Sequence, residues 1–429
     1  MVLSKNIIQK VVKNELSANI LIILFGACMW VLLEYIRTYF LIDFPWILIG
    51  YSQFKFSKVI QIAEFTGVYG VSFLVIFCNL CFYFWILKPK SNKYFYIVLT
   101  LIAVVILFGV ARIDRFKFFE GKEYSFTAVQ PNIDQDEKWN AVCRNKIISK
   151  LKKYASEIAE NKTDLVLWPE AVMPGLIPNY EEIYSDAKNI AGTAGGLNII
   201  GSLHDEGDCY YNSVLAFEDS NGYKAVHNKN HLIIFGEFIP FRNFLSRFFG
   251  ILNKMGDFSR GKDTNIFDNG QIYAGSTICS ENFIPDISRK FVLSGAMVLT
   301  NHTNDAWFFD TAAPHQHFMM NVFRAVENRK DVIVSANSGI SGIIEASGII
   351  INETPSSKSV LLKGTFHQND YKTFYTKHGD VFVYLCMGFL FIVVGWACIV
   401  TVKTNFFIKE VIIMLEQQKE KIDALRRSL

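Results

Sequence analysis

The sequence predicts a membrane protein in which apolar helical spans flank one α/β domain. Hydrophobic residues make up 51% and aromatic residues 15% of its 429 residues, a composition too apolar for a wholly soluble chain. Four uncharged apolar runs are long enough to cross a bilayer. Between residues 112 and 380 the composition changes, and short β-branched runs alternate with helical stretches, as in an α/β fold.

The N-terminal membrane region covers residues 1–111. It holds three of the expected spans, at about 16–33, 65–87 and 94–111. Lysines precede the first span and fill the turn between the second and third, which places both on the cytoplasmic side by the positive-inside rule.

The segment after the first span has the character of a membrane interface. Glu34 and Arg37 follow the span and share a helix face, where they can pair with each other or with lipid headgroups. The stretch from Phe44 to Gln53 is aromatic and broken by proline and glycine. We therefore expect it to lie at the outer interface or to re-enter the membrane.

The fourth span is expected at 381–402 and is followed by a basic tail, 403–429. Alternation along the chain places both termini in the cytoplasm and residues 112–380 on the outer side. The spacing of isoleucine, valine and leucine over 408–425 predicts a short amphipathic helix that lies on the membrane surface.

Residues 112–380 are expected to form one soluble domain with a single core. Its predicted strands are Phe126–Val129, Leu165–Trp168, Asn198–Gly201, Ser213–Ala216, Ile272–Ile278, Met297–Thr300 and Val332–Ser335. Helical stretches such as Asn145–Glu160 and His315–Asn328 separate them. Strands that alternate with helices predict an α/β architecture.

Three reactive residues stand where apolar strands end or break off. Glu170 follows Leu165-Val-Leu-Trp-Pro169, in which the proline stops the strand; Lys229 lies in His227-Asn-Lys-Asn-His231; and Cys279 ends the run from Ile272. A carboxylate to take the thiol proton, an ammonium to stabilise the thiolate and oxyanion, and a thiol to carry the acyl group are the parts of an acyl-transfer site. Taken singly, each is more often a solvated charge or a core residue.

The order and local sequence of these residues resemble the nitrilase, or carbon–nitrogen hydrolase, superfamily. The matching segments are Leu167-Trp-Pro-Glu170, Asn228-Lys229 with Phe235-Gly-Glu237, and Ile278-Cys-Ser-Glu281. In that superfamily the Glu, Lys and Cys set is catalytic on a four-layer α-β-β-α sandwich. The resemblance therefore implies this nitrilase-like fold for residues 112–380.

Further motifs make the chain similar to the apolipoprotein N-acyltransferase family within that superfamily. They are Phe44-Pro-Trp46, Gly50-Tyr-Ser-Gln53, Val129-Gln-Pro-Asn132, Lys138-Trp139, Ile234-Phe-Gly-Glu-Phe-Ile-Pro240, Asn304-Asp-Ala-Trp-Phe308, Arg324-Ala-Val-Glu-Asn328 and Phe374-Tyr-Thr-Lys-His-Gly-Asp380. The resemblance implies that Cys279 takes an acyl chain from a phospholipid as a thioester. The α-amine of a diacylglyceryl-cysteine at the N-terminus of an apolipoprotein then receives it.

The resemblance also implies supporting residues around the nucleophile. Glu237 would orient Lys229 or shuttle protons, with a buried structural ion pair as the alternative. Glu281 would support the nucleophile. Trp139 and Trp307 would bind substrate, although plain packing also accounts for both.

Two features depart from the family pattern. Ser280 follows the nucleophile where the family usually has an aromatic residue, which bears on the shape of the acyl pocket. The chain also has fewer apolar spans than the family, so the N-terminal membrane region is expected to be shortened.

An apolar stretch from Phe241 to Met255 lies between Lys229 and Cys279. It includes Phe248 and Phe249 and is too apolar for an ordinary exposed loop. We expect it to dip into the outer leaflet and to contact the acyl chains of the substrate, with packing beneath the sandwich as the alternative.

Neither a metal nor nucleic acid is expected. His315 and His317 stand two apart and share no helix face, and no carboxylate completes a set with them and His302. No other cofactor is expected either. The net charge of +3 comes without a long basic run away from the spans, so nucleic acid is not an expected partner.

Together these observations predict an acyltransferase in the inner membrane of a bacterium with two membranes, with its catalytic domain in the periplasm. Its expected partners are a phospholipid donor, a diacylated apolipoprotein acceptor and the membrane; no oligomeric state is predicted. A membrane-tethered nitrilase-type amidase that hydrolyses small amides is the nearest alternative. A truncated, inactive membrane protein is a third hypothesis, against which the intact Glu170, Lys229 and Cys279 set argues.

Overall fold

The computed structural model describes residues 14–41, 45–46, 48–87, 92–117, 121–242 and 257–428. The chain divides into two compact units, one made of 1–33, 73–99 and 383–429, the other of 34–72 and 100–382. The first unit is built from parts of long apolar helices. The second unit contains both β-sheets and all the reactive residues predicted from the sequence.

Four helices are long and apolar enough to cross a membrane, as the sequence predicts. They are α2 (Glu15–Ile36), which continues as a π-helical segment (Arg37–Leu41), α4 (Ala63–Leu87), α5 (Lys93–Lys117) and α13 (Val381–Ser428). Within the first unit α2 and α4 approach closely at Gly26, where a Cβ would come within 2.8 Å of Leu80. Small residues allow such close contacts between membrane helices.

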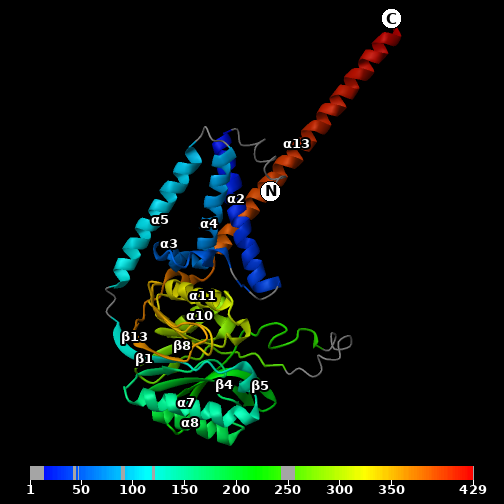
Figure 1. Cartoon of the computed structure of the whole chain (residues 1–429). Helices are drawn as coiled ribbons and strands as arrows, with labels where there is room; N and C mark the ends of the chain where they lie inside the picture. The colour runs from blue at the N-terminus through cyan, green and yellow to red at the C-terminus, as the bar shows by residue number, and fades with distance from the viewer. Residues whose placement is uncertain are drawn as a thin grey trace. The chain divides into compact units, whose positions relative to one another are not determined.

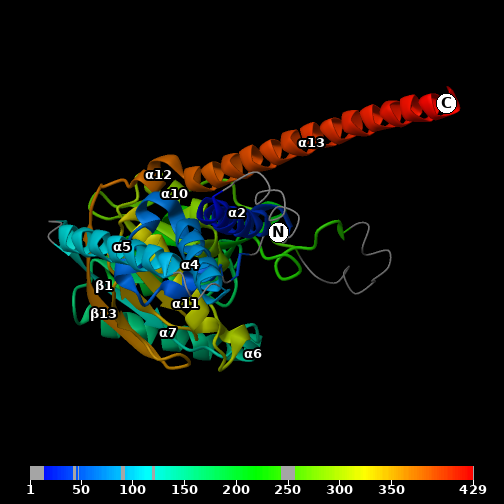
Figure 2. The same ribbon diagram turned by 90° about the horizontal axis from the view of Figure 1, so that it is seen from above.

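Two helix ends differ from the sequence-based expectation. The first span was expected to end near Leu33, but α2 continues past Glu34, whose buried carboxylate accepts a hydrogen bond from the backbone of Ile49 at 2.8 Å. Figure 2 shows α13 as one uninterrupted helix rather than a span followed by a separate short helix. No glycine or proline stands between Val402 and Ser428 to interrupt it.

Two β-sheets form the centre of the second unit. The first contains seven strands in the order β13-β1-β2-β4-β5-β6, with β3 beside β4. Their bounds are β1 Lys122–Gln130, β2 Leu165–Leu167, β3 Leu176–Ile177, β4 Leu197–Glu206, β5 Cys209–Phe217, β6 Tyr223–Asn228 and β13 Val360–Gln368. The second contains six strands in the order β12-β11-β10-β9-β8-β7. Their bounds are β7 Phe267–Asp268, β8 Tyr273–Ile278, β9 Val298–Thr303, β10 Val332–Ala336, β11 Gly342–Ile344 and β12 Ile350–Glu353.

Helices cover the outer faces of both sheets (Figure 1). Helices α7 (Arg144–Ala159) and α8 (Glu181–Ala194) bury their apolar faces on the first sheet. Helices α10 (Pro285–Leu293) and α11 (Ala313–Asn328) lie on the second. The short helices are α3 Ser57–Ile60, α6 Gln135–Lys138, α12 Phe374–His378, η2 Ile49–Gln53, η3 Ala141–Cys143, η5 Cys279–Phe283 and η6 Ala306–Phe308.

The core between the two sheets completes the sandwich. Side chains from β1, β2, β4 and β5 meet side chains from β7 to β11 in one continuous apolar cluster. A second cluster lies between the first sheet and helices α7 and α8. Such face-to-face packing buries one side of each sheet, and the helices bury the other. The predicted α-β-β-α layer order is therefore confirmed.

A buried ion pair on α11 is hydrogen-bonded to the segment before the domain. Arg324 donates hydrogen bonds to Glu327 at 2.9 Å and to the hydroxyl of Tyr51 in η2 at 3.2 Å. Glu327 also accepts from the backbone of Val68 at 2.9 Å. All of these residues are buried. Charged groups are tolerated there because each has a partner of opposite charge or a hydrogen bond.

Candidate active site

The reactive residues predicted from the sequence meet at one edge of the sandwich. Glu170 follows β2, Cys279 directly follows β8, and Lys229 directly follows β6. Parallel strands β8, β9 and β10 end at the same edge, because parallel neighbours share their direction. The site is thus carried by loops on a rigid sheet framework.

Glu170 is held in a fixed orientation by two hydrogen bonds. Its Oε1 accepts from the side-chain amide of Asn212 on β5 at 2.7 Å, and its Oε2 accepts from the backbone of Asn304 at 2.9 Å. The turn that carries it crosses Gly201, where a Cβ would come within 2.1 Å of the carbonyl oxygen of Pro169. Only glycine permits this close crossing of β4 and the turn.

Lys229 is buried between two carboxylates. Its Nζ lies 2.8 Å from Oε1 of Glu237 and 3.8 Å from Oε1 of Glu170. Burial by itself would lower the pKa of Lys229, but Glu237, Cys279 and Glu170 outweigh it and raise the pKa above its ordinary value. Lys229 therefore stays a cation at any physiological pH.

Cys279 stands at the strand end with a left-handed backbone, φ +49°. This conformation is unfavourable for a residue with a side chain and is found where the surrounding structure imposes it. Burial, and then the charge of Glu170, raises the pKa of the thiol well above its ordinary value, with Lys229 opposing the shift. The resting thiol is protonated and needs a base before it can attack.

His317 supports the backbone of Cys279. Its Nε2 donates to the carbonyl oxygen of Cys279 at 3.2 Å, and its Nδ1 lies 2.8 Å from Oδ1 of Asp305. Burial disfavours the charged imidazole, but Asp305 outweighs it and raises the pKa of His317. The sequence offered His317 only as a rejected metal ligand, and its role beside Cys279 is visible only in the structure.

Glu237 links Lys229 to the loop that follows it. Besides Lys229, it accepts hydrogen bonds from Asn212 at 3.2 Å and from the backbone of Ile233 at 2.9 Å. Asn212 therefore bridges the two carboxylates, Glu170 and Glu237, that flank the lysine. Sequence reasoning missed Asn212, since an asparagine within a strand carries no local signal of such a role.

Glu281 connects the nucleophile to the lysine loop. Its carboxylate accepts from the backbone of Ile278 at 2.8 Å and of Asn230 at 2.6 Å, and lies 3.2 Å from Nε2 of His227. Burial would raise the pKa of Glu281, but His227 and the backbone amides outweigh it and lower the pKa. The ionised carboxylate thus holds the loops that carry Lys229 and Cys279 in register.

Replacing Glu281 by Gln is expected to reduce the free energy of unfolding by about 2 kcal/mol at pH 7, because an amide presents a donor to the backbone amides that the carboxylate accepts from. The folded-state pKa of Glu281 lies below its ordinary value of 4.5, so its stabilisation is present above that pH and is lost as the pH falls through the folded-state value. Thermal unfolding of both proteins in detergent micelles should show the difference at pH 7 and its disappearance in acid. A difference independent of pH would contradict this role.

The two predicted substrate-binding tryptophans line different cavities. Trp139 is half-exposed and lines a cavity of about 250 Å³ together with Lys138. Trp307 is exposed and lines a cavity of about 610 Å³ together with Asp305. Both cavities adjoin the site, because Lys138 donates to the carbonyl oxygen of Glu170 at 3.2 Å and Asp305 contacts His317.

Ser280, Phe248 and Phe249 are the remaining residues that the sequence singles out near the site. Ser280 is fully buried, and its hydroxyl has no hydrogen-bond partner within the described part of the chain. Phe248 and Phe249 lie outside the described residues, as does the rest of the predicted arm after Arg242. Among the residues that the structure describes, no three His, Cys, Asp or Glu side chains are arranged to hold a metal ion.

Two protein-family models match this chain. Residues 126–373 match the model of the carbon–nitrogen hydrolase family, and residues 3–81 match that of the apolipoprotein N-acyltransferase N-terminal domain. The apolipoprotein N-acyltransferase of Geobacter metallireducens is 33% identical over 373 residues, covering 84% of this chain and 71% of that protein. That of Rickettsia bellii is 31% identical over 378 residues, covering 85% of this chain and 74% of that protein.

Solved structures with a similar fold come from the nitrilase superfamily. Nit3 of Saccharomyces cerevisiae has a TM-score of 0.45 and 16% identity, covering 57% of this chain and 90% of that chain. An amidase from Nesterenkonia AN1 has a TM-score of 0.47 and 16% identity, covering 62% of this chain and 97% of that chain.

Proposed function

Because this chain belongs to the apolipoprotein N-acyltransferase family of carbon–nitrogen hydrolases, we propose that its Cys279 carries an acyl chain from a phospholipid to the N-terminal amine of a diacylglyceryl-cysteine. The protein is an acyltransferase of lipoprotein maturation, and its acceptor is an apolipoprotein. The observation that carries the proposed chemistry is the placement of Lys229 between Glu170 and Glu237, beside a thiol that is protonated at rest.

In the first step Glu170 takes the proton from Cys279, and Sγ attacks the ester carbonyl carbon of the phospholipid. The ammonium of Lys229 stabilises the oxyanion that forms on the carbonyl oxygen. Collapse of this intermediate breaks the carbon–oxygen bond, and the proton on Glu170 passes to the departing glycerol oxygen. The products are a thioester on Cys279 and a lysophospholipid.

In the second step the acceptor amine attacks the thioester carbonyl carbon. Glu170 takes a proton from the attacking nitrogen, and Lys229 again stabilises the oxyanion. The carbon–sulfur bond breaks, the proton on Glu170 passes to Sγ, and the amide leaves. Because both steps pass through a tetrahedral oxyanion at the same place, one site serves an ester donor and an amine acceptor in turn.

Lys229 suits this role because its charge is retained when substrate enters. Its partner Glu237 neutralises it in the resting site and fixes the position of Nζ at 2.8 Å. Asn212 holds both carboxylates at fixed positions, so little reorganisation is needed when the oxyanion forms.

The protein is an inner-membrane protein, and the part of the chain that the structure describes holds four helices long and apolar enough to span a membrane. The basic residues next to its spans favour cytoplasmic termini and a periplasmic catalytic domain. In that arrangement the thiol would face the periplasm.

The amidase alternative is not favoured. Residues 3–81 match the acyltransferase N-terminal domain, and the relatives named above are apolipoprotein N-acyltransferases, which supports acyl transfer rather than amide hydrolysis.

The test is mass spectrometry of the purified protein after incubation with phosphatidylethanolamine. We expect an acyl adduct on Cys279 that is absent from the Cys279→Ala variant, and that disappears when a diacylated lipopeptide with a free N-terminal amine is added. A lipopeptide whose amine is acetylated should leave the adduct in place. Hydrolysis of small amides without any acyl adduct would refute the proposal.

A further inference from the structure

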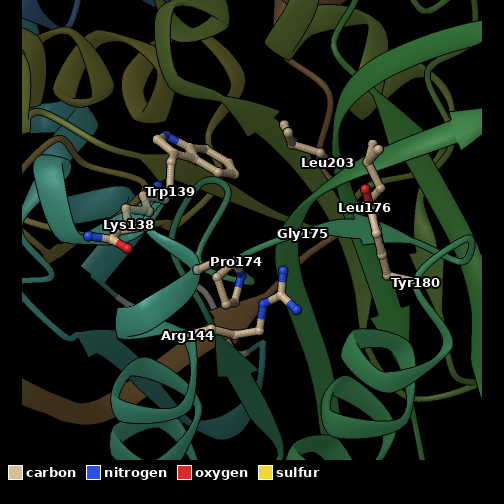
Figure 3. Close-up of a pocket in the computed structure, with 10 residues that line it drawn as sticks. Lys138, Trp139, Arg144, Pro174, Gly175, Leu176, Tyr180 and Leu203 are labelled. Carbon is tan, nitrogen blue, oxygen red and sulfur yellow. The ribbon is translucent and has the colours of Figure 1, made fainter.

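The cavity beside Trp139 adjoins Glu170, the proposed general base. Figure 3 shows it between the segment 138–144 and the loop that carries Pro174 and Gly175, a few residues after Glu170. It encloses about 250 Å³. Its lining residues are Lys138, Trp139, Asn140, Ala141, Arg144, Pro174, Gly175, Leu176, Tyr180 and Leu203.

The pocket contains two cations and no acid. Arg144 begins α7, and its guanidinium points into the pocket toward Gly175 (Figure 3). The Nε of Arg144 is shielded from solvent and has no hydrogen-bond partner among the described residues. This nitrogen can therefore donate a hydrogen bond to an acceptor bound in the pocket.

Lys138 is the second cation. Its side chain is 2% exposed, and its Nζ donates to the carbonyl oxygen of Glu170 at 3.2 Å, which leaves two of its three donors for other acceptors. Burial lowers the pKa of Lys138 to about 8, although Glu170 and Cys279 oppose the shift. Lys138 is therefore still largely charged at neutral pH, although burial makes that charge costly.

We propose that this pocket binds the phosphate group of the phospholipid donor, with Arg144 and Lys138 as its ligands and Trp139 covering the adjoining glycerol. The proposal rests on the proposed function and names the part of the donor that the protein recognises.

A phosphate fits the chemistry of the pocket better than a carboxylate or a neutral group. A guanidinium and an ammonium are the side chains that proteins use to bind phosphate oxygens, because they form charge-assisted hydrogen bonds. The apolar part of the lining, Leu176 and Leu203 with Trp139, suits the carbon skeleton next to the phosphate. Lys138 would hold the phosphate near Glu170. The donor needs this position if its ester is to reach Cys279.

Replacing Arg144 by Gln should slow thioester formation from phospholipid while sparing a donor without phosphate. With phosphatidylethanolamine and with phosphatidylglycerol, we expect the rate to fall roughly 10- to 100-fold, as for the loss of a charge-assisted hydrogen bond to a bound anion. With a p-nitrophenyl fatty-acyl ester the rate should change by less than about twofold. Arg144→Lys should fall between wild type and Arg144→Gln. The matched control is Lys153→Gln, a solvent-exposed cation on the same helix, which should leave all rates unchanged.

A binding measurement separates this proposal from the proposed chemistry. Titration of the full-length Cys279→Ala protein with glycerophosphoethanolamine, the deacylated headgroup, should give saturable binding. This binding should be lost in the double variant that carries both Cys279→Ala and Arg144→Gln. Inorganic phosphate should compete with that headgroup for binding. It should not alter the rate of thioester formation from the p-nitrophenyl ester. A change in that rate would make the pocket a site for free phosphate and would overturn the proposal.

The pocket assignment would also be overturned if Arg144→Gln slowed thioester formation equally with phospholipid and with the p-nitrophenyl ester. Headgroup binding that is unaffected by Arg144→Gln would overturn it as well. If wild-type protein forms no thioester with any phospholipid yet the Cys279→Ala protein binds the headgroup through Arg144, the proposed function fails while the pocket assignment stands.

Discussion

Replacing Glu170 by Gln is expected to lower the rate of thioester formation on Cys279 by roughly a thousandfold at pH 7, within the range for loss of a general base. The thiol pKa is raised by burial and then by Glu170 itself, so almost no thiolate exists without a base to accept the proton. Glutamine keeps the size of Glu170 and its hydrogen bond from Asn212 but accepts no proton.

The pH dependence of this variant gives a sharper signature than the rate alone. Removing the negative charge of Glu170 removes one cause of the high thiol pKa, so the pKa of Cys279 falls in the variant. As the pH rises, thiolate forms without a base, and the deficit relative to wild type should shrink.

Single-turnover formation of the acyl adduct, followed by mass spectrometry between pH 6 and about pH 10, measures both effects. The control is Glu182→Gln, an exposed glutamate at the start of α8, which should behave as wild type. A Glu170→Gln protein that forms the adduct at the wild-type rate would exclude Glu170 as the base.

Replacing Arg324 by Met is expected to reduce the free energy of unfolding by about 3–5 kcal/mol, the range for breaking one partner out of a buried ion pair. Arg324 contacts Glu327 through two pairs of atoms at 2.9 Å and donates to the carbonyl oxygen of Asn282 at 3.1 Å. Burial raises the pKa of Glu327 to about 7 even with Arg324 present, so without Arg324 the carboxylate is left buried and unpaired.

The double replacement of Arg324 and Glu327 by Met separates the ion pair from simple packing. It removes both charges and should be less destabilising than Arg324→Met alone, because no uncompensated charge remains. Thermal unfolding of the three proteins in the same detergent provides the comparison. A loss below about 1 kcal/mol in Arg324→Met would mean that the pair is no stronger than a surface salt bridge.

The Arg324 variant should also affect catalysis indirectly. Asn282, whose carbonyl oxygen accepts from Arg324, stands three residues after Cys279 in the same short helix, η5. Loss of that contact loosens the turn that carries the nucleophile. The adduct on Cys279 should therefore form more slowly in this variant even at temperatures where it remains folded.

Among the strands that the sequence predicts, β2 and β10 have the clearest apolar runs, Leu165–Leu167 and Val332–Val334. Strand β13 was missed because its exposed and buried residues alternate irregularly and include charged side chains. Its structure depends on β1, which it pairs with in antiparallel register across more than half the length of the chain. Pairing between such distant segments has no local signal in the sequence.

The candidate site shows the same division. Glu170, Lys229 and Cys279 are recognisable from the sequence because each follows a strand in a short characteristic segment. Asn212 and His317 are not, because their roles depend on which atoms the packed strands and helices bring within hydrogen-bonding distance.

By itself, the sequence determined the four apolar spans, the alternation of strands and helices, and the three reactive side chains at strand ends, since these depend on hydrophobicity and spacing over a few residues. Only the tertiary structure decided that Lys229 lies between two carboxylates, and that Arg144 and Lys138 line one pocket whose lining contains no acid. The physical reason is that charges interact through space, over distances that chain folding sets and that spacing along the sequence does not reveal.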